Sequence, residues 1–134
     1  MKSNRRKFIA TSAALAVGTA ASALPNTHMA DKYPVVHHVL FWLKNPNSKV
    51  DRDKLIAGVK TLAKIPTVRE LRVGVVASTE KRDVVDNSWG VSELMFFSDL
   101  AGQKAYQDHP IHTKFVEECS PLWDKVIVYD AVEA

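Results

Sequence analysis

Beyond residue 34, the pattern of apolar and polar positions divides the chain into stretches typical of strands and stretches typical of helices. Four stretches are rich in β-branched and aromatic residues or alternate between apolar and polar positions, which indicates strands at 35–44, 68–78, 89–97 and 126–131. Three others carry apolar residues at helical spacing and predict helices over about 51–64, 100–108 and 111–119. The resulting order, β-α-β-β-α-α-β, predicts an α+β domain of the ferredoxin-like type, with an antiparallel four-stranded sheet.

Local signals predict where these helices begin and end. Ser48, followed three residues later by Asp51, has the spacing of a capping box, and Ser98-Asp99 is a plausible cap for the second helix. Pro66 disfavours helix in the residue before it, and Pro121 ends the last helix. The charged segment 79–88 is predicted to be a loop.

The first, third and last strands are apolar on both of their alternating faces. A domain of this type has helices on one face of its sheet, so its other face is expected to be polar. Two or three short helices do not cover both faces, and an exposed apolar sheet predicts a homodimer formed through the sheet faces. The alternative is a monomer with an unusually apolar surface. The residues concerned are Val39, Leu40, Phe41, Trp42, Leu43, Val91, Leu94, Met95, Phe96, Phe97, Val126, Ile127, Val128 and Tyr129.

Composition and charge narrow the classes of partner. The chain has 134 residues, enough for one domain, and a net charge of +3, but four of its 18 basic residues precede the first acidic residue, Asp31. The remaining fourteen basic residues face 15 acidic ones, which argues against nucleic acid or an anionic membrane as the main partner. Cys119 is the single cysteine, so an intramolecular disulfide and a cysteine-rich metal site are excluded.

Residues 1–24 have the pattern of an export signal. A basic start is followed by a mild apolar stretch and by Ala21-Ser22-Ala23, a small-x-small cleavage pattern. The run Asn4-Arg5-Arg6-Lys7-Phe8-Ile9 resembles a twin-arginine signal, which predicts export, to the periplasm, with no membrane attachment after cleavage. An ordinary secretion signal and a retained anchor are the alternatives. Residues 25–34 are predicted to be a flexible linker before a domain spanning 35–134.

Several motifs occur along the domain in an order that is more specific than any one of them. They are HHVLFWLK at 37–44, IPTV at 65–68, Gly74, Tyr106 followed by HPIH at 109–112, PLW at 121–123 and VIVYD at 126–130. In this order the chain resembles the stress-responsive dimeric A/B-barrel (Dabb) family over about residues 35–132. The family includes plant stress proteins, bacterial proteins of unknown role, and polyketide cyclases that use a tyrosine and the second histidine of a His-Pro-x-His motif.

The resemblance implies a barrel shared between two subunits, with a pocket in each protomer between sheet and helices. Tyr106 and His112 match the family's catalytic tyrosine and histidine, and His37 matches a pocket histidine. We therefore name His112 and Tyr106 as candidate catalytic residues. The candidate ligand-binding residues are His37, Trp42, Glu93 and His109.

The residues themselves are compatible with acid–base chemistry. Pro110 suits the first turn of a new helix, which places His112 near a helix N-terminus, where the helix dipole favours the neutral imidazole of a general base. Tyr106 could then hydrogen-bond a developing enolate. Alternatively, both histidines of the motif serve the turn alone, and Tyr106 is a core residue. His37, His109 and His112 could conceivably hold a metal, but no carboxylate or thiolate supports them, so we predict neither metal nor cofactor.

Two functions remain open from the sequence. The first is an exported barrel that binds a small, partly apolar carbonyl compound, with cyclase-like or lyase-like chemistry carried by His112 and Tyr106. The second is a non-catalytic dimer, stress-related or structural, that binds a hydrophobic molecule or none. They differ in whether polar groups converge inside a hollow pocket.

Overall fold

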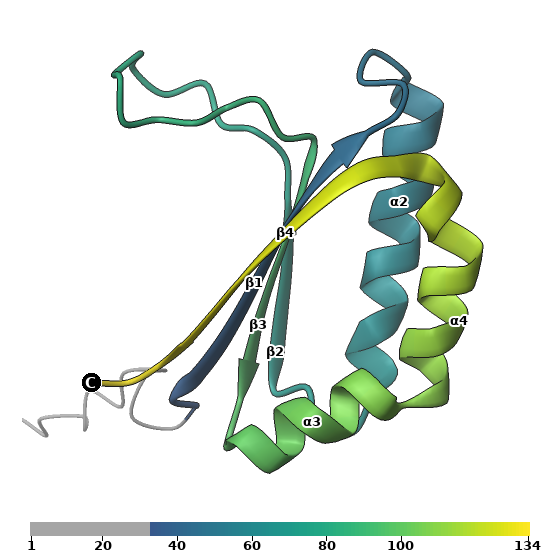
Figure 1. Ribbon diagram of the computed structural model, residues 1–134, viewed down its shortest axis with the longest axis vertical. Coiled ribbons are helices and arrows are strands. Elements are labelled where there is room, and N and C mark those ends of the chain that lie inside the picture. Colours follow the sequence, from purple (N-terminus) through teal and green to yellow (C-terminus); the bar gives the residue numbers. More distant parts are fainter. Residues whose placement is uncertain (1–32) are drawn as a thin grey trace, which may run out of the picture.

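A computed structural model describes residues 33–134, and the predicted export signal and most of the predicted linker lie outside the described residues. The domain is one sheet covered by helices on one of its faces (Figure 1). In chain order, the elements are β1 (Val35–Leu43), α2 (Lys49–Thr61), a 3-10 turn (Leu62–Lys64), β2 (Glu70–Gly74), β3 (Val91–Phe97), α3 (Leu100–Asp108), α4 (Pro110–Cys119), a second 3-10 turn (Ser120–Leu122) and β4 (Trp123–Val132).

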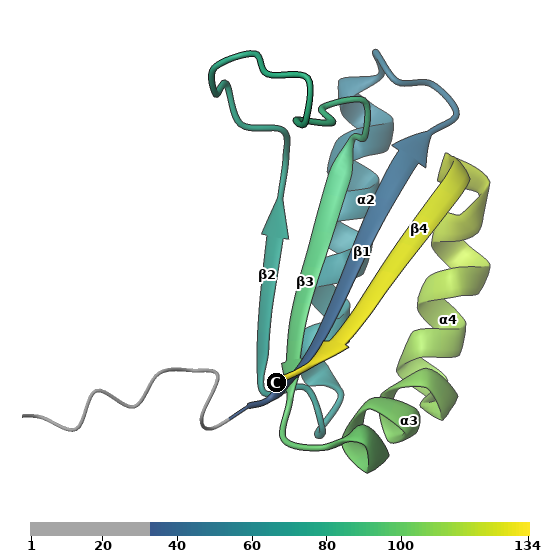
Figure 2. The ribbon, with the colours of Figure 1, turned by 60° about the vertical axis from the view of Figure 1, so that its left-hand side comes forward.

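The four strands form one antiparallel sheet in the order β2-β3-β1-β4. This order and the helices on a single face confirm the predicted ferredoxin-like α+β fold. Figure 2 shows the strands side by side, with β2 and β4 at the two edges of the sheet. The segment between β2 and β3 projects away from the sheet on the side opposite the helices (Figure 1).

Strand alternation decides which side chains reach the core. The odd-numbered residues of β1 and β3 are all buried against the helices, whereas their even-numbered neighbours are half-buried on the open face. In the core, these strand residues pack against Leu55 and Val59 of α2, Leu62 of the first 3-10 turn and Phe115 of α4. The open face carries the apolar side chains of Val36, Leu40, Trp42, Leu94, Phe96, Ile127 and Tyr129.

The helix ends follow the predicted signals. The Ser48 hydroxyl accepts a hydrogen bond from the Asp51 backbone N–H at 3.2 Å, and the Asp99 carboxylate accepts one from the Gly102 N–H at 2.7 Å. At the start of α4, His109 Nδ1 accepts from the Ile111 N–H at 3.1 Å, and Pro110 occupies the first helical position. Each cap satisfies a backbone donor that the helix itself leaves unpaired.

All four strands differ in length from the predicted ranges, and β2 and β4 differ most. β2 ends at Gly74 rather than at residue 78, because its partner β3 begins at Val91 and the ladder stops at the pair Gly74–Ser92. β4 is longer than predicted and begins at Trp123, because it pairs with β1 along its full length. Pairing with the neighbouring strand, rather than local composition, sets both limits.

Helix packing at Gly58 yields a stability prediction. A Cβ at this position of α2 would lie 2.4 Å from Cys119 Sγ and 3.4 Å from Phe115 Cδ2 of α4. Gly58→Ala should therefore lower the free energy of unfolding by about 1–3 kcal/mol, despite the better helix propensity of alanine. Urea unfolding of the variant would measure this loss. In the background Cys119→Ala the sulfur is absent, so the same substitution should cost much less; an equal cost in both backgrounds would contradict the packing argument.

Candidate functional site

A cavity of about 130 Å³ lies between the sheet and the helices α3 and α4. Four of its lining side chains are ionisable: His37, Glu93, Tyr106 and His112. Aromatic and aliphatic side chains make up most of the remaining wall. They are Val39, Phe41, Phe115, Val116, Trp123, Val126 and Val128. A larger hollow of about 350 Å³ lies on the segment between β2 and β3, but exposed loop side chains line it.

Each ionisable group comes from a different element. His37 lies on β1 and Glu93 on β3, both at odd-numbered positions that face the helices, and their exposed fractions are 3% and 1%. Tyr106 reaches in from α3 and is 1% exposed. His112 stands in the first turns of α4, and its ring centroid lies 4.8 Å from that of Tyr106. The sheet and both helices must therefore be in place before the site exists.

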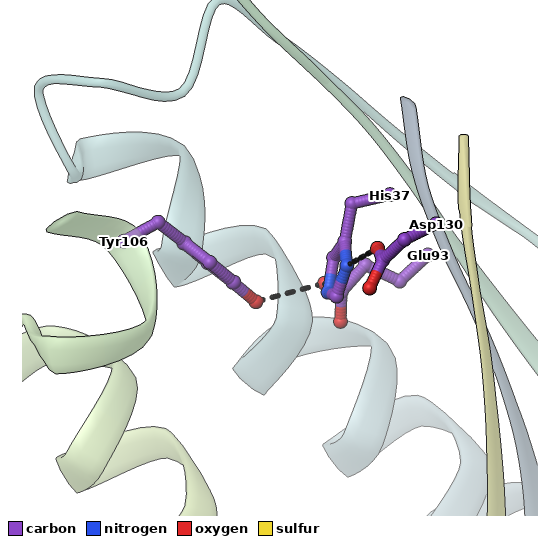
Figure 3. A network of polar contacts seen from close by, with 4 residues as sticks. All are labelled: His37, Glu93, Tyr106 and Asp130. Carbon is purple, nitrogen blue, oxygen red and sulfur yellow. Dashed lines mark hydrogen bonds and ion pairs between the residues drawn. The ribbon is translucent and has the colours of Figure 1, made fainter. Parts of the chain in front are cut away.

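A series of polar contacts joins three of these groups, Tyr106, Glu93 and His37, to Asp130 of β4 (Figure 3). The Tyr106 hydroxyl donates a hydrogen bond to Glu93 Oε1 at 2.9 Å. His37 Nε2 lies 3.9 Å from the same oxygen, and His37 Nδ1 lies 2.5 Å from Asp130 Oδ1. This series of contacts begins at the buried side chains of Tyr106 and Glu93 and ends at the Asp130 carboxylate, which is 57% exposed.

Asp130 fixes the tautomer of His37. A carboxylate only accepts hydrogen bonds, so Nδ1 carries the proton that is donated to Asp130. In the neutral ring, Nε2 then lacks a proton and is an acceptor facing Glu93. Sequence reasoning did not select Asp130, because only the register between β1 and β4 places it opposite His37.

Burial shifts the pKa values within the cavity. Burial raises the pKa of the Glu93 carboxyl from 4.5 to about 7, against the opposing effect of the Tyr106 hydrogen bond. Burial also raises the pKa of Tyr106, and the adjacent Glu93 adds to this. Burial lowers the pKa of His112, with His37 contributing, while a hydrogen bond to the Gln107 backbone opposes the change. His112 is therefore neutral at pH 7, with one ring nitrogen free of a proton.

Two of the predicted ligand-binding residues lie outside the cavity. Trp42 has an even number in β1 and so lies on the open face, where its Nε1 donates to Ser88 Oγ at 2.9 Å. His109 is taken up by capping α4. Strand alternation therefore places the Trp42 side chain away from His37, and the His109 ring is engaged in the helix cap, so neither adds to the cavity; their role as ligand-binding residues stays a prediction. The structure brings together His37, Glu93, Tyr106 and His112.

Within residues 33–134, no group of three or more His, Cys, Asp or Glu side chains is arranged to hold a metal ion. No helix in that part of the chain is long and apolar enough to cross a membrane.

The motifs, the fold and the cavity agree with the comparison to known families. Residues 35–133 match the model of the stress responsive A/B barrel domain, Dabb. The chain belongs to this family. A search among curated proteins finds no match.

Several solved structures share the fold. A Dabb family protein with a ferredoxin-like fold from Mesorhizobium loti is 25% identical, with a TM-score of 0.62 over 76% of this chain and 98% of that one. A dimeric ferredoxin-like protein of unknown function from Thermobifida fusca is 18% identical, with a TM-score of 0.61 over 75% and 91%. A hydroxynitrile lyase from Passiflora edulis is 22% identical, with a TM-score of 0.64 over 77% and 95%.

Proposed function

We propose that this Dabb protein binds a small, partly apolar carbonyl compound in the cavity and acts on it by acid–base chemistry. The observation that carries the proposal is the convergence of His37, Glu93, Tyr106 and His112 in one cavity with aromatic walls. Polar groups that meet in an otherwise apolar pocket and have shifted pKa values are typical of sites that bind and transform small molecules.

The size and the opening of the cavity limit the ligand. An engineered apolar cavity of about 150 Å³ holds a benzene molecule, so about 130 Å³ accommodates a group of similar size. Val116 of α4 and Val126 and Val128 of β4 line the cavity and are partly exposed, at 38%, 36% and 46%. We infer that the opening lies between α4 and β4, and that an apolar part of the ligand rests on these valines.

In the proposed chemistry, α3 and α4 each supply one reacting side chain. The neutral His112 on α4 is the general base that takes a proton next to a carbonyl, and Tyr106 on α3 faces the oxygen that gains charge. His37, oriented by Asp130, is a second acceptor on the opposite wall. A cyclisation that proceeds through an enolate needs this combination. A lyase-type cleavage also needs a base and a hydrogen-bond donor at the oxygen, although the base then takes a hydroxyl proton, and the lyase from Passiflora edulis gives an example of lyase chemistry on this fold.

We also propose that the protein is a homodimer and that it is exported, and each of these two proposals has its own support. The apolar open face and the dimeric state of the Thermobifida fusca protein support a homodimer formed through the sheets. The pattern of residues 1–24 supports export, to the periplasm, through the twin-arginine pathway.

A non-catalytic binding protein is the second candidate. Tyr106 already donates to Glu93, and His112 already bonds the Gln107 backbone, so both groups have partners without a ligand. In that case the cavity would hold an apolar molecule unchanged.

A ligand screen on the mature protein tests the main proposal. Small aromatic and aliphatic ketones should raise the melting temperature, and His112→Ala should weaken the binding of such a ligand about tenfold, because it removes a hydrogen-bonding group from the wall. Glu117→Ala, an exposed position on the same helix, is the matched control and should bind like the parent protein. Ligands that bind the variant His112→Ala equally well would place binding elsewhere.

A further inference from the structure

We propose that Glu93 and Tyr106 form a paired oxyanion site, in which Glu93 works as a neutral carboxylic acid. This inference rests on the proposed function, because it assumes that the cavity holds a carbonyl compound. It goes further by making Glu93 a catalytic residue and by specifying the substrate as one whose reacting oxygen becomes negatively charged.

The geometry of the pair is the first support. The Tyr106 hydroxyl and Glu93 Oε1 are 2.9 Å apart, and both side chains are 1% exposed and line the cavity. They extend toward each other from α3 and from β3, so neither depends on a mobile loop (Figure 3). A rigid pair of this kind is pre-organised for a charge that develops during a reaction.

Counting hydrogen-bond donors shows which form of the pair can bind an oxyanion. When Glu93 is ionised, the pair has one O–H group, that of Tyr106, and the carboxylate already accepts it. No donor is left for a ligand, and the carboxylate repels a negative oxygen. When Glu93 is protonated, the pair has two O–H groups and needs one for its internal bond. The other then points to a ligand oxygen.

The surroundings of Glu93 favour the protonated form. The titratable groups that face it are His37 from β1, Tyr106 from α3, His112 from α4 and, beyond His37, Asp130 from β4. Its direct cross-strand neighbours are apolar, Val39 of β1 and Val73 of β2, and α2 contributes Leu55 and Val59 to the core. Among residues 33–134, no lysine or arginine lines the cavity. His37 Nε2, at 3.9 Å, is too far away for a direct hydrogen bond to the carboxylate.

Burial of this carboxyl is consistent with the same form, since it raises the Glu93 pKa to about 7. A buried carboxylic acid that stays neutral beside a tyrosine is a known way to hold an enolate in another enzyme, ketosteroid isomerase. The cavity here has the same two kinds of donor.

The proton and electrons balance with His112 as base. His112 takes the proton as the C–H bond next to the carbonyl breaks, and the bonding electron pair moves into the carbonyl group. The oxygen gains the negative charge and accepts the hydrogen bond from the Glu93–Tyr106 pair. The imidazolium then returns its proton to a carbon or to a leaving group, and the charge on the oxygen is lost.

Binding of 4-nitrophenol tests the pair without a known substrate. Its phenolate mimics an enolate, its ring has the size of benzene, and it ionises near neutral pH with a change in absorbance. Spectrophotometric titration should show that the parent protein binds the phenolate and that its affinity falls about tenfold between pH 7 and pH 8.5, as Glu93 loses its proton.

Variants assign this pH dependence to Glu93. Glu93→Gln keeps a donor at every pH, so it should bind the phenolate with less than a twofold fall over the same range. Tyr106→Phe leaves the Glu93 O–H as the pair's one donor and removes the hydrogen bond that orients it, so this variant should weaken binding about tenfold at pH 7. Glu117→Gln, an exposed glutamate on α4, should behave like the parent protein. Circular dichroism of each variant checks that it is folded.

The outcomes separate this inference from the proposed function. A parent protein whose affinity for the phenolate does not change with pH would overturn the paired oxyanion site, and so would a Glu93→Gln variant with the parent's pH dependence. Absence of phenolate binding would overturn it as well. In each of these cases the proposed function still stands if neutral ketones bind and His112→Ala weakens their binding.

Discussion

Glu93→Gln should make the protein more stable at pH 8 and leave its stability at pH 5 nearly unchanged. The pKa of Glu93 is about 7 in the folded chain, against the usual 4.5 of a glutamate side chain. Between these values the folded state holds a proton that the unfolded state has lost, so the free energy of unfolding falls as the pH rises. Above pH 7 this loss of stability is complete, and from the shift in pKa it is about 3–4 kcal/mol.

Glutamine removes this cost because it carries no proton to lose, and its amide oxygen can still accept the Tyr106 hydroxyl. Urea unfolding at pH 5 and pH 8 measures the difference. The exposed Glu117→Gln is the control and should change neither value by more than about 0.5 kcal/mol. A variant that gains equal stability at both pH values would show that Glu93 is not buried in its charged form.

Leu40→Glu should convert the proposed dimer into monomers. Leu40 lies on the open face of the central strand β1, between Ser92 of β3 and Ile127 of β4. In a symmetric dimer each substitution occurs twice, and each buried, unpaired carboxylate costs several kcal/mol. The same side chain is only half-buried in the single protomer, so the domain itself should stay folded.

Sedimentation velocity at micromolar concentration measures this change. Val50→Glu, at a position of α2 that is 64% exposed, places the same charge on the helical side and should leave the mass unchanged. A parent protein that sediments as a monomer, or a Leu40→Glu variant that remains a dimer, would rule out association through the open face.

The sequence predicted the order of elements because each has a local signal. Ser48 and Asp99 cap helices through contacts that span three residues, and Pro110 begins α4 at its own position. Strand limits were predicted less well. The end of β2 and the start of β4 depend on where a distant partner strand runs, and no local pattern contains that information.

The site shows the same division. His112 and Tyr106 were found through a short motif, and both line the cavity. Asp130 was missed because it lies 93 residues after His37 in the sequence, and only the register of β4 against β1 brings the two side chains together. The strand that carries Trp42 is apolar on both faces, so composition alone did not show which face meets the helices and the cavity.

The helices and the cavity lie on one face of the sheet, and the proposed dimer contact uses the other. In such a dimer the two cavities open on opposite outer sides, and each is built from a single chain. Coexpression of an intact chain with one carrying His112→Ala would then give mixed dimers with half the normal turnover per particle, because neither subunit supplies what its neighbour lacks. Selection could therefore alter the ligand site and the subunit contact independently of each other.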